Sequence, residues 1–281
     1  MTHKTKLEEE ELLHSSNSAA HEKNHMVNST KWNYWPDKII DQTTPDYTAD
    51  AIKATNQVDA ALNTAWTLSK NNDPNEKAHE YAGGVVKRKD GTYESVNQKE
   101  GREGDSSPKV RKKDLLDGDV AAGDYHTHPY SPKDAKYNAG TGWDWDGQGT
   151  GPSGGDFTSL AYQKLSNGQF SIIEAGTVRS IIVVTDADAF VKAFKANTGF
   201  DAPTIGKDAT IDAEIDKATH NVDYMDKNPN AKDKKSYVET YWIGLINGLK
   251  EIKKENGDKD IGMKLLRSKA GNKSEYDTVY P

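Results

Sequence analysis

The chain has 281 residues, of which 34% are hydrophobic and 29% charged, and its net charge is -7 at pH 7. Even with glycine added, the apolar share stays below the roughly 45–50% of an ordinary globular chain, so we expect some segments to lie outside the core. The acidic excess disfavours nucleic acid as a partner, because proteins that bind it usually present a basic surface. The sequence contains no cysteine, so any transition metal must be held by histidine and carboxylate side chains.

The sequence also bears on where the protein acts. No run approaches the ~18–20 uninterrupted apolar residues of a membrane span, so we expect no membrane span. The stretch from Met1 to Glu11 lacks the apolar region of a secretory signal peptide. We therefore expect a protein that is cytoplasmic as synthesised, which leaves export by a specialised secretion system open.

Three parts follow one another along the chain. Residues 1–47 are polar and irregular and are predicted to form an N-terminal arm. Residues 48–197 alternate helix and strand patterns, which predicts one α/β domain. Residues 198–281 are predicted to be a C-terminal extension, whose clear element is an amphipathic helix packed on the core. No internal repeat is visible, which favours one domain with long embellishments.

In chain order, the first predicted element is a helix over 48–70, where apolar side chains recur at three- and four-residue steps. Two β-prone runs within 80–96 flank an Asp-Gly pair, which favours a hairpin. The charged stretch 97–114 is predicted to be an exposed loop. Alternating residues over 120–126 then predict a strand that ends at His126.

After the strand predicted over 120–126 comes a glycine-rich stretch, 131–155, whose composition predicts a long loop. A helix is predicted over 156–165 and a buried strand over 180–185, the most apolar run in the chain. Further helices are predicted over 187–195 and 236–254, both amphipathic.

The residues that carry chemistry are His126-Thr-His128-Pro129 and, further on, Ser153-Gly-Gly-Asp156. In an extended segment, residues two apart project to the same side, so His126 and His128 can reach one metal ion. Asp156, in the first turn of the next helix, can complete a set of three ligands. Two histidines and a carboxylate leave a fourth tetrahedral position to water, as in catalytic zinc sites. The sequence therefore predicts a Zn2+ site.

A zinc-activated water needs a general base and an oxyanion donor. Bound zinc lowers the pKa of its water to about 7, and a base must still accept the proton and deliver it to the leaving amine. Glu80, at the start of the hairpin, is our candidate, and Glu94 on the second hairpin strand is the alternative. The hydroxyl of Ser153 could donate a hydrogen bond to the oxyanion.

At these residues the chain resembles the JAB/MPN family, also called JAMM metalloproteases. The family motif is an upstream glutamate, then His-x-His-Pro, then Ser-x-x-Asp. The resemblance implies a zinc ion on the two histidines and the aspartate, with Glu80 as general acid and base and Ser153 at the oxyanion. It also implies a cytidine-deaminase-like α/β core over about residues 48–197, a curved mixed sheet flanked by helices.

One departure from the family is the spacer between Pro129 and Ser153, which is longer than usual. It can be a surface insertion whose ends meet, because loop closure costs little extra entropy as loops lengthen. We favour a flap over the cleft in which Trp143 and Trp145 bind substrate, because long loops beside active sites are often functional.

These residues predict a zinc-dependent hydrolase of peptide or isopeptide bonds, with a protein or peptide as substrate. Similar JAB-like domains occur in bacterial toxins and secreted effectors, which implies a cognate immunity or delivery protein as a further partner. The alternative is a non-catalytic binding or scaffold module of the same family. Glu174 has two interpretations, a carboxylate that orients an imidazole or an exposed acid at a strand end, and we favour the exposed acid.

Overall fold

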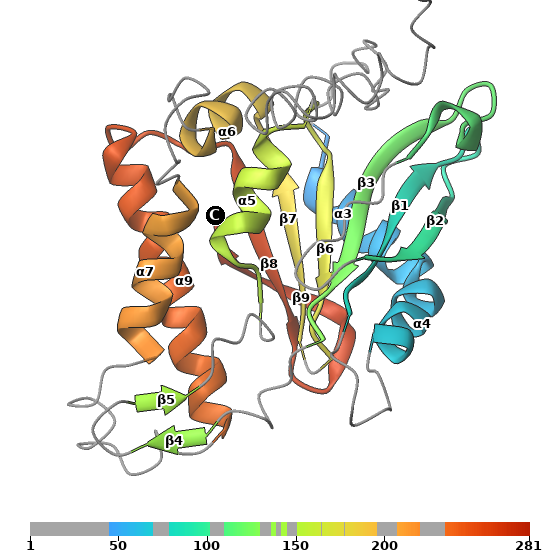
Figure 1. Cartoon of the computed structure of the whole chain (residues 1–281). Coiled ribbons are helices and arrows are strands. Elements are labelled where there is room, and N and C mark those ends of the chain that lie inside the picture. The colour runs from blue at the N-terminus through green and yellow to red at the C-terminus, as the bar shows by residue number, and fades with distance from the viewer. Residues whose placement is uncertain are drawn as a thin grey trace, which may run out of the picture.

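The centre of the molecule is a seven-stranded mixed sheet with helices on both faces, as Figure 1 shows for this computed structural model. This confirms the expected α/β class. None of the helices within the described residues is long and apolar enough to cross a membrane. The structure describes residues 45–69, 79–101, 110–129, 136–138, 142–144, 151–163, 165–176, 178–195, 207–219 and 234–281.

The strands of this sheet lie in the order β2-β1-β3-β6-β7-β8-β9. They are β1 (Tyr81–Lys87), β2 (Tyr93–Glu100), β3 (Val120–Thr127), β6 (Phe170–Glu174), β7 (Arg179–Val184), β8 (Met263–Lys269) and β9 (Asn272–Tyr280). Neighbouring strands are antiparallel except β3 and β6, which are parallel. A parallel pair needs a crossover, and here the crossover contains helix α5 (Gly154–Ala161). A separate pair, β4 (Lys136–Asn138) and β5 (Gly142–Asp144), lies within the predicted long loop.

Each face of the sheet packs against a large hydrophobic core, because successive strand side chains point to opposite faces. Ile172 and Ile181 face α3 (Tyr47–Gln57) and α4 (Asp59–Ser69). Ile173 and Ile182 face the helices of the other side. Those helices are α5, α6 (Ala187–Phe194), α7 (Lys207–Thr219) and α9 (Lys234–Glu255).

Several predicted elements are confirmed, namely the hairpin β1–β2, strands β3 and β7, and helices α5, α6 and α9. The predicted helix 48–70 is two helices, because the backbone leaves helical geometry at Val58 (φ -96°, ψ 12°). The predicted loop 97–114 is wrong at its start, where residues 97–100 belong to β2. Strands β6, β8 and β9 and helix α7 were not anticipated. The predicted division at residues 47 and 197 stays a prediction, and most of the predicted arm, residues 1–44, lies outside the described residues.

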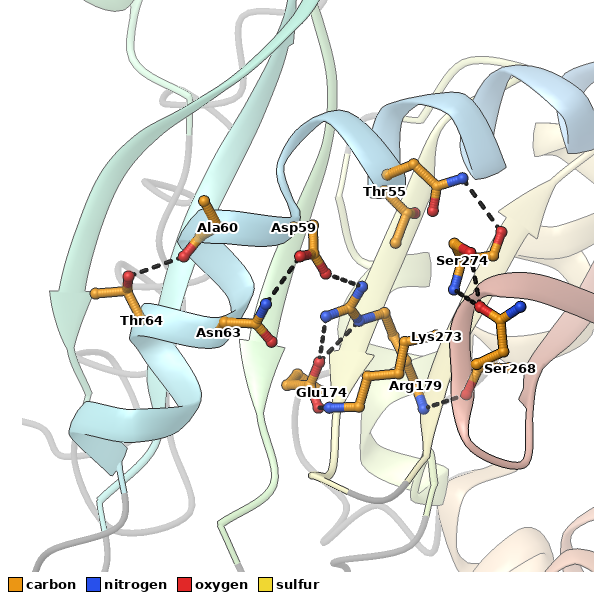
Figure 2. Close-up of polar contacts among 12 residues, drawn as sticks. Thr55, Asp59, Ala60, Asn63, Thr64, Glu174, Arg179, Ser268, Lys273 and Ser274 are labelled. Carbon is orange, nitrogen blue, oxygen red and sulfur yellow. Dashed lines mark hydrogen bonds and ion pairs between the residues drawn. The ribbon is translucent and has the colours of Figure 1, made fainter.

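An ionic cluster built around a buried pair lies between the sheet and helices α3 and α4 (Figure 2). Arg179 and Glu174 are both fully buried, and the Arg179 Nε atom donates to Glu174 at 2.7 Å. Asp59, the first residue of α4, accepts from Arg179 at 2.9 Å, and Lys273 donates to Glu174 at 2.6 Å. Both interpretations of Glu174 are therefore wrong. Its side chain is neither exposed nor next to an imidazole, because it shares the face of Ile172.

Candidate metal centre

Strand β3 and the first turn of α5 bring His126, His128 and Asp156 together. The two Nε2 atoms of the histidines are 3.1 Å apart, and His126 Nε2 is 2.9 Å from Asp156 Oδ1. His128 Nε2 is 3.5 Å from Asp156 Oδ2. One ligand atom from each of the three residues lies within 4.8 Å of the others, so the three residues could hold one metal ion.

The position of Asp156 follows from the local chemistry of the Ser-x-x-Asp sequence. A serine before a helix and an acid three residues later form reciprocal hydrogen bonds that start the helix. Here Asp156 Oδ2 accepts from the backbone N–H of Ser153 at 2.7 Å and from its hydroxyl at 3.0 Å. The other oxygen, Oδ1, is directed at His126. The motif that begins α5 therefore also aims its carboxylate at the histidines.

His128 is held at its backbone and at its ring. Its N–H donates to the carbonyl of Glu174 at the end of β6, at 2.9 Å. Its ring Nδ1 lies 2.9 Å from the carbonyl oxygen of Gly151, which can only accept. In the neutral ring the proton is then on Nδ1, which leaves the lone pair on Nε2, the atom that faces Asp156. This is the usual way in which proteins orient a histidine ligand.

Of the two glutamates considered, Glu80 is the one near the histidines. It is 5% exposed and directly precedes β1, where Ala82 pairs with His126. Its charge is among those that raise the pKa of His126. Glu94 pairs with Val86, about 13 Å further along β1 at ~3.3 Å per residue, and accepts from Arg88 at 2.7 Å.

The electrostatics of the centre favour a cation between the imidazoles and the carboxylate. Burial of His126 disfavours its charged form, but the negative charges of Asp156, Glu80 and Asp124 together outweigh this effect. The pKa of His126 is therefore raised from 6.5 to about 9. Burial alone would raise the pKa of Asp156, but His126 and His128 hold it well below its usual value of 3.8. Burial raises the pKa of Asp124, two residues before His126 on the same face of β3. A proton or a metal ion can therefore occupy the same place.

The remaining predicted residues are placed as follows. Ser153 is largely buried, and its hydroxyl donates to Asp156. Trp143 lies in β5, but its side chain is outside what the structure describes, and so is all of Trp145. The predicted contact of these tryptophans with substrate stays a prediction.

Sequence reasoning missed several residues around the centre. The hydroxyl of Tyr241, in α9, donates to the carbonyl of Pro152 at 2.9 Å. Asp212, in α7, accepts from the backbone N–H of Gly154 at 2.8 Å. Asp124 lies two residues before His126 on β3, so the strand alternation already places it on the same face as the histidines. No local pattern indicates the other two residues.

Comparison with known proteins does not identify the chain. A scan against protein-family models found no match, and neither did searches of curated proteins and of solved structures. Function must therefore be inferred from the geometry of the centre.

Proposed function

We propose that the protein is a zinc-dependent hydrolase of amide bonds, with the metal held by His126, His128 and Asp156. The observation that carries the proposal is the convergence of two imidazole Nε2 atoms and a carboxylate oxygen. A tetrahedral ion with bonds of about 2.0–2.1 Å separates its ligand atoms by roughly 3.3 Å. His126 Nε2 lies 2.9 Å from Asp156 Oδ1 and 3.1 Å from His128 Nε2, so these ligand atoms need to move apart only slightly. Imidazole and carboxylate without thiolate suit zinc among the transition metals.

The partial exposure of the centre supports a catalytic role. The side chains of His126 and Asp156 keep 13% of their exposure, whereas that of His128 keeps 2%, so one side of the centre remains accessible. When bound, zinc supplies Lewis acidity, which acidifies water and polarises a carbonyl. In our proposal Glu80 accepts the proton of the attacking water and passes it to the leaving amine.

Ser153 has two roles in this proposal. Its hydroxyl holds Asp156 in the structure, at 3.0 Å. To stabilise an oxyanion, the hydroxyl must rotate towards the substrate. The backbone N–H of Ser153 continues to hold the carboxylate during that rotation, at 2.7 Å.

The resemblance to the JAB/MPN family supports the same reaction. The order Glu80, His-Thr-His-Pro and Ser-Gly-Gly-Asp matches the family motif, and the helices on both faces of a mixed sheet are compatible with its core. We propose this core for the chain, with a protein or peptide as substrate and Trp143 and Trp145 as substrate contacts. By the same analogy, a role as an exported bacterial effector or toxin with an immunity or delivery partner belongs to the proposal.

Metal analysis combined with three substitutions tests the proposal. We expect about one zinc per chain in the purified protein, lost in His128→Ala and in Asp156→Ala. Glu80→Gln should keep zinc but lose hydrolysis of peptide and isopeptide-linked fluorogenic probes. Glu94→Gln, the matched control on the other hairpin strand, should keep both.

Two results would count against the enzyme. Zinc-free protein whose stability is unchanged by a chelator would favour the scaffold module. Full hydrolysis by Glu80→Gln would remove the glutamate from the mechanism.

A further inference from the structure

The loop that leads into α5 is fixed by helices from the far end of the chain. The Tyr241 hydroxyl lies 2.9 Å from the Pro152 oxygen and 3.4 Å from the Gly151 oxygen. Gly151 lies flat against α9, since a Cβ at this position would come within 2.9 Å of the ring of Trp242. These contacts leave little freedom for the Gly151 carbonyl.

The same carbonyl orients a proposed metal ligand. The Gly151 oxygen accepts from His128 Nδ1 at 2.9 Å and also lies 3.4 Å from the Tyr241 hydroxyl. Tyr241 and His128 are both almost fully buried, so water does not substitute freely for these contacts. A displacement of this carbonyl would rotate the imidazole away from the other ligands.

A second contact acts on the carboxylate ligand. Asp212 of α7 accepts from the N–H of Gly154, the first residue of α5, at 2.8 Å. Asp156 lies in the same first turn, and its Oδ1 is directed at His126. The carboxylate of Asp212 therefore fixes the end of the helix that carries Asp156.

We infer that α7 and α9 are part of the metal centre, and that Tyr241 and Asp212 are positioning residues for the ligands His128 and Asp156. This inference rests on the proposed metal centre and extends it to a region that the sequence marked as an extension. Groups that orient metal ligands typically contribute roughly 10–100-fold in metal affinity. The hydrogen bonds that carry the inference run from Tyr241 to the Pro152 carbonyl and from the Gly154 N–H to Asp212, so each residue acts on a ligand through the backbone beside it.

Matched substitutions separate positioning from packing. Tyr241→Phe keeps the ring in the core and removes only the hydroxyl. Its control is Tyr280→Phe, which removes from the same core a buried hydroxyl that has no hydrogen-bond partner among the described residues. Asp212→Ala removes an exposed acid, and Asp216→Ala removes another exposed acid one turn later on the same helix.

The affinity for zinc, measured by competition with a chromophoric chelator, is the first readout. We expect Tyr241→Phe and Asp212→Ala to weaken it roughly 10–100-fold and the two controls to change it by less than about threefold. Equal affinities in all four variants and the unchanged protein would overturn the inference while leaving the metal centre intact.

The second readout needs no metal and is NMR of the ¹⁵N-labelled imidazoles. In Tyr241→Phe we expect the Nδ1 proton of His128 to shift and to exchange faster with water, with no change in Tyr280→Phe. Should the unchanged protein bind no zinc, the proposed function fails, and this measurement alone decides whether Tyr241 orients the ring. An unchanged His128 signal in Tyr241→Phe would refute that role.

Discussion

The ion pair between His126 and Asp156 makes the stability of the metal-free protein depend on pH in a predictable way. The pKa of His126 is about 9 in the folded protein against 6.5 for the free group. A group whose pKa is raised on folding stabilises the protein fully below the lower value and loses that contribution as pH rises through the higher value. The difference of about 2.5 pH units (9 minus 6.5) corresponds to about 3 kcal/mol at ~1.36 kcal/mol per unit.

The lowered pKa of Asp156 reflects the same ion pair, so it adds no further stabilisation to this value. The assay is urea unfolding of chelator-treated protein between pH 6 and pH 10, with His126→Asn measured beside the unchanged chain. We expect the difference between them to shrink by up to about 3 kcal/mol from pH 6.5 to above pH 9. Asp156→Asn should remove the same pH dependence, since it removes the partner. A difference that stays constant, or grows towards pH 10, would refute the reasoning.

Three further predictions concern the metal, the ionic cluster and the sheet. Because a proton on His126 competes with the metal, zinc affinity measured against a chelator should fall about tenfold per pH unit below pH 9. Arg179→Met should lower the unfolding free energy in urea by about 3–5 kcal/mol, because it leaves Glu174 buried with Lys273 as its remaining ion-pair partner. Gly123→Ala should lower the thermal midpoint, with a cost of about 1–3 kcal/mol or more, because its Cβ would come within 2.2 Å of the Phe170 carbonyl oxygen.

Each of these has a contrary result. A pH-independent affinity would mean that His126 carries no competing proton. If adding Glu174→Gln to Arg179→Met recovered no stability, an uncompensated buried charge would not be the cause of the loss. An unchanged midpoint in Gly123→Ala would show that β3 and β6 can separate at little cost.

The candidate ligands could be predicted because their geometry is local. Alternation in a strand places His126 and His128 on one side, and the Ser-x-x-Asp sequence starts a helix with its acid turned back. Two further elements were predicted from local sequence, β7 because it is the most apolar run and α9 because its apolar residues recur with helical periodicity. The crossover from β3 to β6 brings the His-Thr-His-Pro and Ser-Gly-Gly-Asp motifs together. The sequence predicted the helix of this crossover, α5, but not the strand β6 at its end.

The elements that the sequence did not predict either contain buried polar residues or have few apolar residues. Strand β6 is buried along its whole length although it contains the polar residues Ser171 and Glu174. The glutamate can be buried because Arg179 and Lys273 form ion pairs with it. Helix α7 buries Ile211 and Ile215 among charged neighbours, too few apolar residues for its periodicity to be recognised. The contact of Tyr241 with Pro152 joins residues far apart in the chain, so only the assembled fold reveals it.

Glu174 connects the candidate metal centre, on one face of the sheet, with the ionic cluster on the other face. Its peptide carbonyl accepts from the backbone of His128, while its side chain forms ion pairs with Arg179 and Lys273 beneath the opposite helices. Anyone who transplants the His-Thr-His-Pro segment into a designed scaffold therefore needs a parallel neighbour strand that offers a carbonyl at that register. If the glutamate is kept there, the scaffold must also supply its cationic partners. The smallest segment set that can be transplanted therefore includes the neighbouring strand and the ion-pair partners on the other face of the sheet, as well as the metal ligands.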